Sequence, residues 1–73
     1  VYPNPATESI TFDWKQNINN LNLVIYDESG RIAIHKTISN HEKVTVNQLL
    51  SGLYIYRLSI ENNTIDIGKI SIK

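Results

Sequence analysis

The longest apolar run of the chain reads Leu49-Leu50-Ser51-Gly52-Leu53-Tyr54-Ile55-Tyr56-Arg57-Leu58-Ser59-Ile60. From Tyr54 onward its side chains alternate between two faces, and this period of two indicates a β-strand. Both faces carry apolar residues, as expected of a central strand with a neighbour on each side. The run therefore predicts a β fold built around this strand.

A turn leads into the central strand. Gly52 stands where the chain enters it, and a glycine there suits a positive φ or a close backbone approach. Tyr54, two residues later, has the spacing of a tyrosine corner, in which the phenol hydroxyl bonds to backbone just upstream. A plain buried strand after a turn is the simpler interpretation.

Short apolar or alternating runs predict five further strands, at residues 9–14, 21–26, 31–39, 43–47 and 65–73. In the segment 31–39 we expect Ile32, Ile34 and Ile38 to face inward. In the last segment the apolar parity changes on either side of Gly68, which predicts a β-bulge at that glycine. Asp27-Glu28-Ser29-Gly30 predicts a turn, since aspartate bonds its own backbone and glycine accepts the left-handed conformation.

The first residues hold both prolines of the chain, Pro3 and Pro5. Each proline fixes φ and removes an amide donor, so this segment predicts an extended edge piece anchored by Tyr2. Six or seven short strands with turns between them predict an all-β fold, a small antiparallel, Ig-like β-sandwich. An open barrel is the alternative.

The composition limits the function classes. Seventy-three residues are enough for one domain, so we expect residues 1–73 to form a single module cut from a longer protein. Seven basic and seven acidic side chains give no net charge, and neither a nucleic acid nor a membrane surface is an expected partner. Cysteine is absent, which excludes disulfides and thiolate chemistry.

Few residues suggest chemistry. His35 and His41 lie on a strand face and in a loop, which favours solvated side chains over a metal site. No histidine or acid is placed to activate Ser29 or Ser51 as a nucleophile. We expect no enzyme activity and no cofactor. One further option is a sugar-binding platform, although core packing is favoured for the four aromatic side chains concerned: Trp14, Tyr26, Tyr54 and Tyr56.

Four short motifs resemble, in the same order along the chain, those of the C-terminal sorting domain (the secretion tail) of proteins exported by the type IX secretion system of Bacteroidota. They are Tyr2-Pro3-Asn4-Pro5, Ile25-Tyr26-Asp27-Glu28-Ser29-Gly30-Arg31, Leu49-Leu50-Ser51-Gly52-Leu53-Tyr54 and Lys69-Ile70-Ser71-Ile72-Lys73. Each motif is weak alone, but together, in this order, they span essentially the whole chain. One departure is Gly68, which stands before Lys69 where many members have a second basic residue.

The resemblance implies that the domain is a secretion signal and not an enzyme. Such a domain ends a cargo that has reached the periplasm, and the outer-membrane translocon and its shuttle components export that cargo. A cell-surface protease often removes the domain, and the cargo is released or held at the cell surface. We expect Ile70 and Ile72 to dock on the sandwich while Lys69 and Lys73 stay exposed, and the resemblance implies that the translocon reads this terminal strand. The alternative is an Ig-like or fibronectin-like accessory module that binds a glycan or a protein, which an exposed aromatic row would favour.

Overall fold

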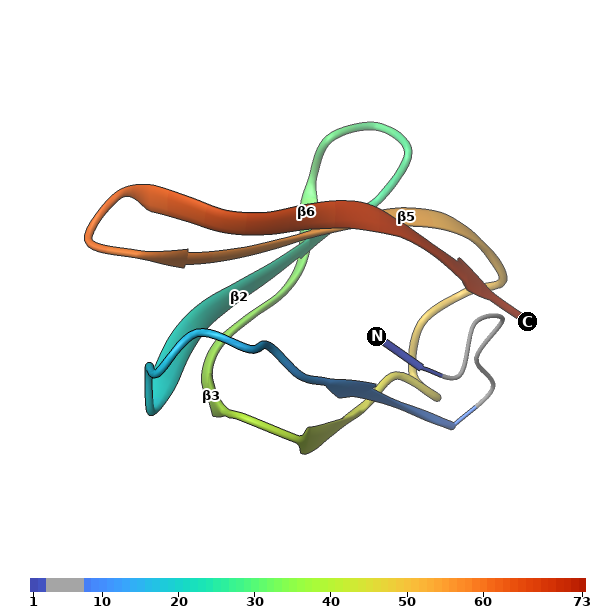
Figure 1. Cartoon of the computed structure of the whole chain (residues 1–73). Coiled ribbons are helices and arrows are strands. Elements are labelled where there is room, and N and C mark those ends of the chain that lie inside the picture. The colour runs from blue at the N-terminus through green and yellow to red at the C-terminus, as the bar shows by residue number, and fades with distance from the viewer. Residues whose placement is uncertain (3–7) are drawn as a thin grey trace.

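A computed structural model describes residues 1–2 and 8–73 and contains six β-strands. They are β1 (Ser9–Phe12), β2 (Asn20–Tyr26), β3 (Ile32–Ser39), β4 (Glu42–Thr45), β5 (Gly52–Ile60) and β6 (Asn63–Ile72). Strands β1 and β4 form one antiparallel sheet, and the other sheet has the antiparallel order β3-β2-β5-β6 (Figure 1). The predicted small, Ig-like sandwich is confirmed, with two sheets rather than an open barrel. Within the described residues, no helix has the length and apolarity needed to cross a membrane.

Strand β5 is the central strand that the apolar run predicts, since it pairs with β2 on one side and β6 on the other. Alternate side chains of β5 lie in two different environments, one buried and one exposed to solvent. Tyr54, Tyr56 and Leu58 are buried on the face toward β1, whereas Leu53 and Ile55 on the opposite face are exposed. The sandwich therefore covers only one face of this strand.

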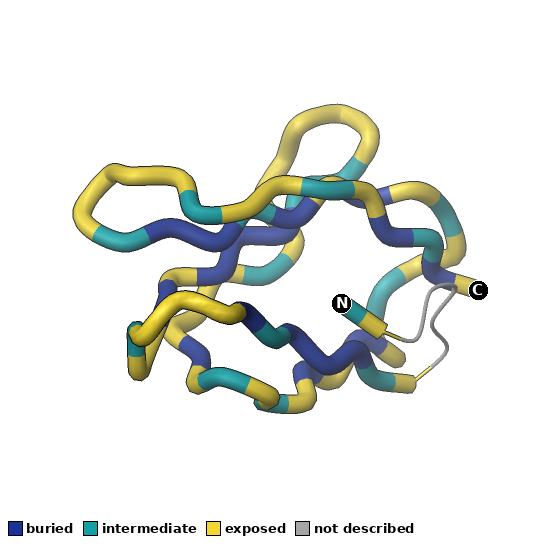
Figure 2. Tube along the Cα trace, in the orientation of Figure 1, coloured by how far each residue is buried: buried dark blue, intermediate teal, exposed yellow. Residues whose placement is uncertain are grey.

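The core lies between the two sheets. Figure 1 shows β5 and β6 above β1, which is drawn in blue, and Figure 2 shows that the connecting turns are largely exposed. An edge-to-face contact of Phe12 with Tyr56, with ring centroids 5.4 Å apart, joins the layers. The buried core side chains are Ile10, Phe12, Trp14, Leu21, Leu23, Ile25, Ile38, Val44, Val46, Tyr54, Tyr56, Leu58, Ile70 and Ile72.

The predicted bulge at Gly68 is wrong. Gly68 pairs regularly with Tyr56, and the register shifts further along, where Leu58 faces Asp66 but Ser59 faces Thr64. Ile65 is thus the extra residue. Gly68 instead leaves room for a ring, because a Cβ there would lie 2.6 Å from Cε2 of Tyr56.

The expectation that Ile32 faces inward is also wrong, since its side chain is 60% exposed. Ile25 faces Ile34, but the next residue, Tyr26, faces Ile32. Ala33 is therefore an extra residue in β3, and this shift turns Ile32 away from the core. Ile38 is buried and Ile34 is half-buried against the core, as expected.

Candidate functional site

The first motif is held through its backbone. The amide of Tyr2 donates to the carbonyl of Thr11 at 3.0 Å, and the amide of Thr11 donates to the carbonyl of Tyr2 at 2.6 Å. The Tyr2 side chain is 53% exposed, so the predicted anchor is the backbone bridge to β1. The expectations for Pro3, Asn4 and Pro5 lie outside the described residues.

The second motif forms the predicted turn between β2 and β3. Oδ1 of Asp27 accepts hydrogen bonds from the amides of Ser29 at 2.9 Å and Arg31 at 3.0 Å. The amide of Gly30 donates to the carbonyl of Asp27, and Gly30 has a φ of +84°. The Asp27 carboxylate also lies 3.8 Å from Nε of the exposed Arg31. The Asp27 carboxylate therefore stabilises the turn through hydrogen bonds to the backbone of the turn itself.

The third motif is a tyrosine corner. The hydroxyl of Tyr54 donates to the carbonyl of Leu50 at 2.7 Å, as the spacing predicts. Gly52 has a φ of +154°, which confirms the predicted positive φ. The amide of Leu49 bonds to the carbonyl of Val46, and its half-buried side chain packs against the core. These bonds fix the path of the chain into β5.

The fourth motif lies in β6 and runs to the end of the chain. Ile70 and Ile72 are buried, opposite Tyr54 and Gly52 of β5. Lys69 and Lys73 are exposed. The expected docking of the terminal strand is therefore present, with both lysines at the surface.

Three of the four motifs meet at one end of the larger sheet. Oε1 of Glu28, in the turn, accepts a hydrogen bond from the amide of Leu53 at 3.3 Å. A Cβ on Gly52 would lie 3.4 Å from the same oxygen. Because Gly52 also pairs with Ile72, the turn, the corner and the terminal strand are contiguous. Tyr2 instead bridges to Thr11 of β1, in the other sheet.

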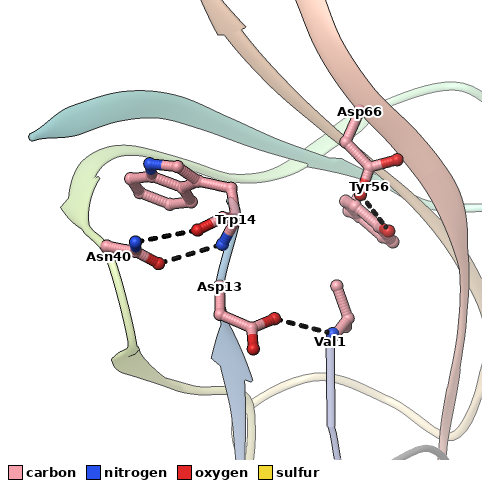
Figure 3. Close-up of polar contacts among 6 residues, drawn as sticks. All are labelled: Val1, Asp13, Trp14, Asn40, Tyr56 and Asp66. Atoms are coloured by element: carbon pink, nitrogen blue, oxygen red, sulfur yellow. Dashed lines mark hydrogen bonds and ion pairs between the residues drawn. The ribbon is translucent and has the colours of Figure 1, made fainter. Parts of the chain in front are cut away.

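The candidate aromatic platform is not exposed. Trp14, Tyr54 and Tyr56 are buried in the core and Tyr26 is half-buried. The Asn40 side chain holds the backbone of Trp14 with two hydrogen bonds of 2.9 Å, as Figure 3 shows. Core packing is thus the role of Trp14, Tyr54 and Tyr56, whereas Tyr26 lies on the outer face of the larger sheet, opposite Ile55 of β5.

Tyr56 makes a second polar contact that the sequence does not reveal. Its hydroxyl donates to Oδ2 of Asp66 at 2.9 Å (Figure 3). Burial, followed by this hydrogen bond, raises the pKa of the Tyr56 hydroxyl to about 12. The phenol therefore stays protonated at neutral pH and serves as a donor inside the sandwich.

A hollow on the outer face of the larger sheet was not predicted from the sequence. Its lining includes Asp27, Leu53, Tyr54, Ile67 and Lys69, so residues of three motifs contribute to it. The sequence feature that could have indicated this hollow is the presence of apolar residues on both faces of β5.

The family model for the secretion system C-terminal sorting domain matches residues 1–73. The chain belongs to this family. No curated protein and no solved structure matches it. Sorting domains of this family are secretion signals of type IX cargo, which confirms the predicted resemblance and function. A sorting domain of this kind interacts with the type IX system and accompanies export to a secreted or cell-surface state.

Proposed function

We propose that this chain is the non-catalytic C-terminal module of a larger secreted protein of Bacteroidota, and that it directs this cargo across the outer membrane. The observation that carries the proposal is the family match over all 73 residues. The contiguity of the turn, the corner and the terminal strand adds support, because one receptor surface can contact all three.

The partners we propose are the outer-membrane translocon with its shuttle components, which bind the folded domain, and a cell-surface protease that removes it. The polar groups of the motif cluster support a non-catalytic role. Asp27, Glu28 and Tyr54 each hydrogen-bond to backbone of the turn or corner, and these bonds hold local geometry. We therefore assign recognition, and no reaction, to this end of the sheet.

A sufficiency experiment tests the proposal. Val1–Lys73 is fused to the C-terminus of a fluorescent protein that carries a periplasmic signal peptide. The fusion is expressed in a Bacteroidota host with a working type IX system and in one without the translocon. We expect reporter at the surface or in the medium of the first host only, because one translocon must recognise unrelated cargos through this domain alone.

Two controls accompany the fusion. Moving the domain to the N-terminus of the reporter removes its free carboxyl end, and we expect export to fail. Deleting residues 69–73 also removes the buried Ile70 and Ile72, so folding of that variant has to be measured alongside its export. Periplasmic retention of the folded original fusion in both hosts would refute the sorting assignment and favour an accessory binding module.

A further inference from the structure

The outer face of the larger sheet carries a contiguous apolar surface. In the ladder, Ile55 of β5 lies between Tyr26 of β2 and Lys69 of β6. In the next outward-facing row, Arg57 lies between Val24 and Ile67. A hollow of about 610 Å³, which we call the outer groove, is lined on this face by Tyr26, Leu53, Ile55, Arg57, Ile67 and Lys69.

The outer groove is open to solvent. Leu53 is 55% exposed, Ile55 42% and Ile67 61%. Single exposed apolar residues are common, but a cluster on one face of a soluble protein marks an interaction surface. Because these side chains line an open hollow and do not enclose a cavity, the surface suits a macromolecule more than a small ligand.

The charges around the outer groove are arranged unevenly. Arg57 and Lys69 line its β5–β6 side, whereas Asp27 and Glu28 line the end formed by the turn. The acidic groups are engaged by backbone amides of the turn and of Leu53. Within the part of the chain that the structure describes, Nε of Arg57 is buried without a hydrogen-bond partner. Such groups are rare in native structures, and this one leaves a donor atom of the Arg57 guanidinium unsatisfied beside the apolar floor.

We infer that the outer groove is the docking site for a protein segment of the secretion machinery that presents apolar side chains flanking a carboxylate. The inference rests on the proposed function and names the contact surface for it. The apolar side chains would cover Leu53, Ile55 and Ile67, and the carboxylate would pair with the Arg57 guanidinium, whose planar fork suits a carboxylate.

Shape distinguishes this occupant from a membrane surface, because a flat bilayer does not fill a hollow. A protein segment can fill the hollow with apolar side chains and place one carboxylate at Arg57, away from Asp27 and Glu28 at the end formed by the turn. Sedimentation distinguishes it from a second copy of this chain.

The test measures binding of the reporter fusion to the purified type IX translocon. Ile67→Ser and Leu53→Ser change exposed side chains, and Arg57→Glu reverses the charge. We expect each change to weaken binding about tenfold or more, as at interface hot spots. Arg57→Lys, which keeps the charge, should retain more binding than Arg57→Glu. Thermal unfolding of each variant shows whether its fold is intact.

Matched controls lie outside the outer groove. Ile32→Ser removes an apolar side chain of β3 that is 60% exposed and does not line the groove, and Lys15→Glu reverses an exposed charge in the β1–β2 loop. Both should bind within about twofold of the original, as expected for positions outside a hot spot. Folded groove variants that also bind within twofold would overturn the inference while leaving the sorting function intact.

Export separates the two proposals further. A fusion that is exported but does not bind the purified translocon refutes docking on that complex, whereas a fusion that is not exported refutes the sorting function itself. If the fusion binds vesicles of anionic phospholipid and Arg57→Glu abolishes this binding, the occupant is a membrane. If the chain self-associates in sedimentation and Ile67→Ser abolishes this association, the occupant is a second copy. Either result would overturn the inference.

Discussion

The two faces of the β5–β6 hairpin carry similar residues and have opposite surroundings. On the inner face, Tyr54 and Ile70 are directly opposite each other and both are buried against the second sheet. On the outer face, Ile55 and Ile67 are 42% and 61% exposed. Apolar character alone therefore does not place a side chain in the core. The second sheet decides it, because it covers one face and leaves the other for a partner.

The largest difference should appear between Ile70 and Ile67, which lie on the same strand. Ile70→Ala leaves a cavity in the core and should lower the free energy of unfolding by about 3 kcal/mol. Ile67→Ala changes an exposed side chain and should stay within about 0.5 kcal/mol of the original. Chemical denaturation measures both. Equal losses would show that the outer face is as buried as the inner one.

A smaller effect is expected at Gly68, on the inner face. A Cβ there would lie 2.6 Å from Cε2 of Tyr56, so the ring must move away from Asp66 and Phe12. Gly68→Ala should therefore lower stability by about 2 kcal/mol. A double-mutant cycle with Tyr56→Leu provides the control, because removing the ring should remove most of the penalty. A penalty that persists without the ring would assign it to the backbone instead.

The tyrosine corner gives a smaller effect again. Tyr54→Phe removes the hydroxyl that donates to Leu50 and should lower stability by about 1 kcal/mol. The inner-face ring remains in place, so the measurement isolates the hydrogen bond from the packing. Tyr2→Phe is the control, because that side chain is 53% exposed. If both variants unfold at the same denaturant concentration, the corner bond contributes nothing.

The last prediction concerns ionisation of the Tyr56 hydroxyl, which affects stability only at high pH. The folded-state pKa of Tyr56 is raised from 10.0 to about 12, chiefly by burial. The stabilisation by the neutral phenol is therefore complete below pH 10 and is lost as the pH rises toward 12. Tyrosinate absorbance against pH should show a late phase that Tyr56→Phe removes. Absence of that phase would mean that water reaches the inner face.

Local residue patterns predicted most of the fold. The period of two located the strands, and the turn at Asp27 and Gly30 and the corner at Tyr54 followed from the chemistry of those residues. The bulges could not be located in this way. The extra residues, Ala33 and Ile65, are defined by pairing with strands distant in sequence, so a single-strand pattern does not contain their positions.

The site was predicted as four separate motifs, and their assembly was not. The hydrogen bond from Leu53 to Glu28 spans 25 positions and joins the corner to the turn only in the folded chain. The outer groove escaped prediction for a related reason. Apolar residues on both faces of β5 predict neighbours in the sheet, but they do not show which face a second layer covers.

The bulge at Ile65 also determines which single-residue deletions in β6 would preserve the fold. Without it, continuing the ladder from Ser59 and Thr64 would place Lys69 opposite Tyr54, inside the core, and turn Ile70 and Ile72 outward. Deleting Ile65 itself keeps Asp66 opposite Leu58, so every later residue stays on its present side. Deleting Gly68 would reverse all that follow it. Two deletions three positions apart thus have opposite effects. Deleting Ile65 removes an unpaired residue and keeps the inner face of β6, whereas deleting Gly68 turns the buried side chains outward and the exposed ones inward.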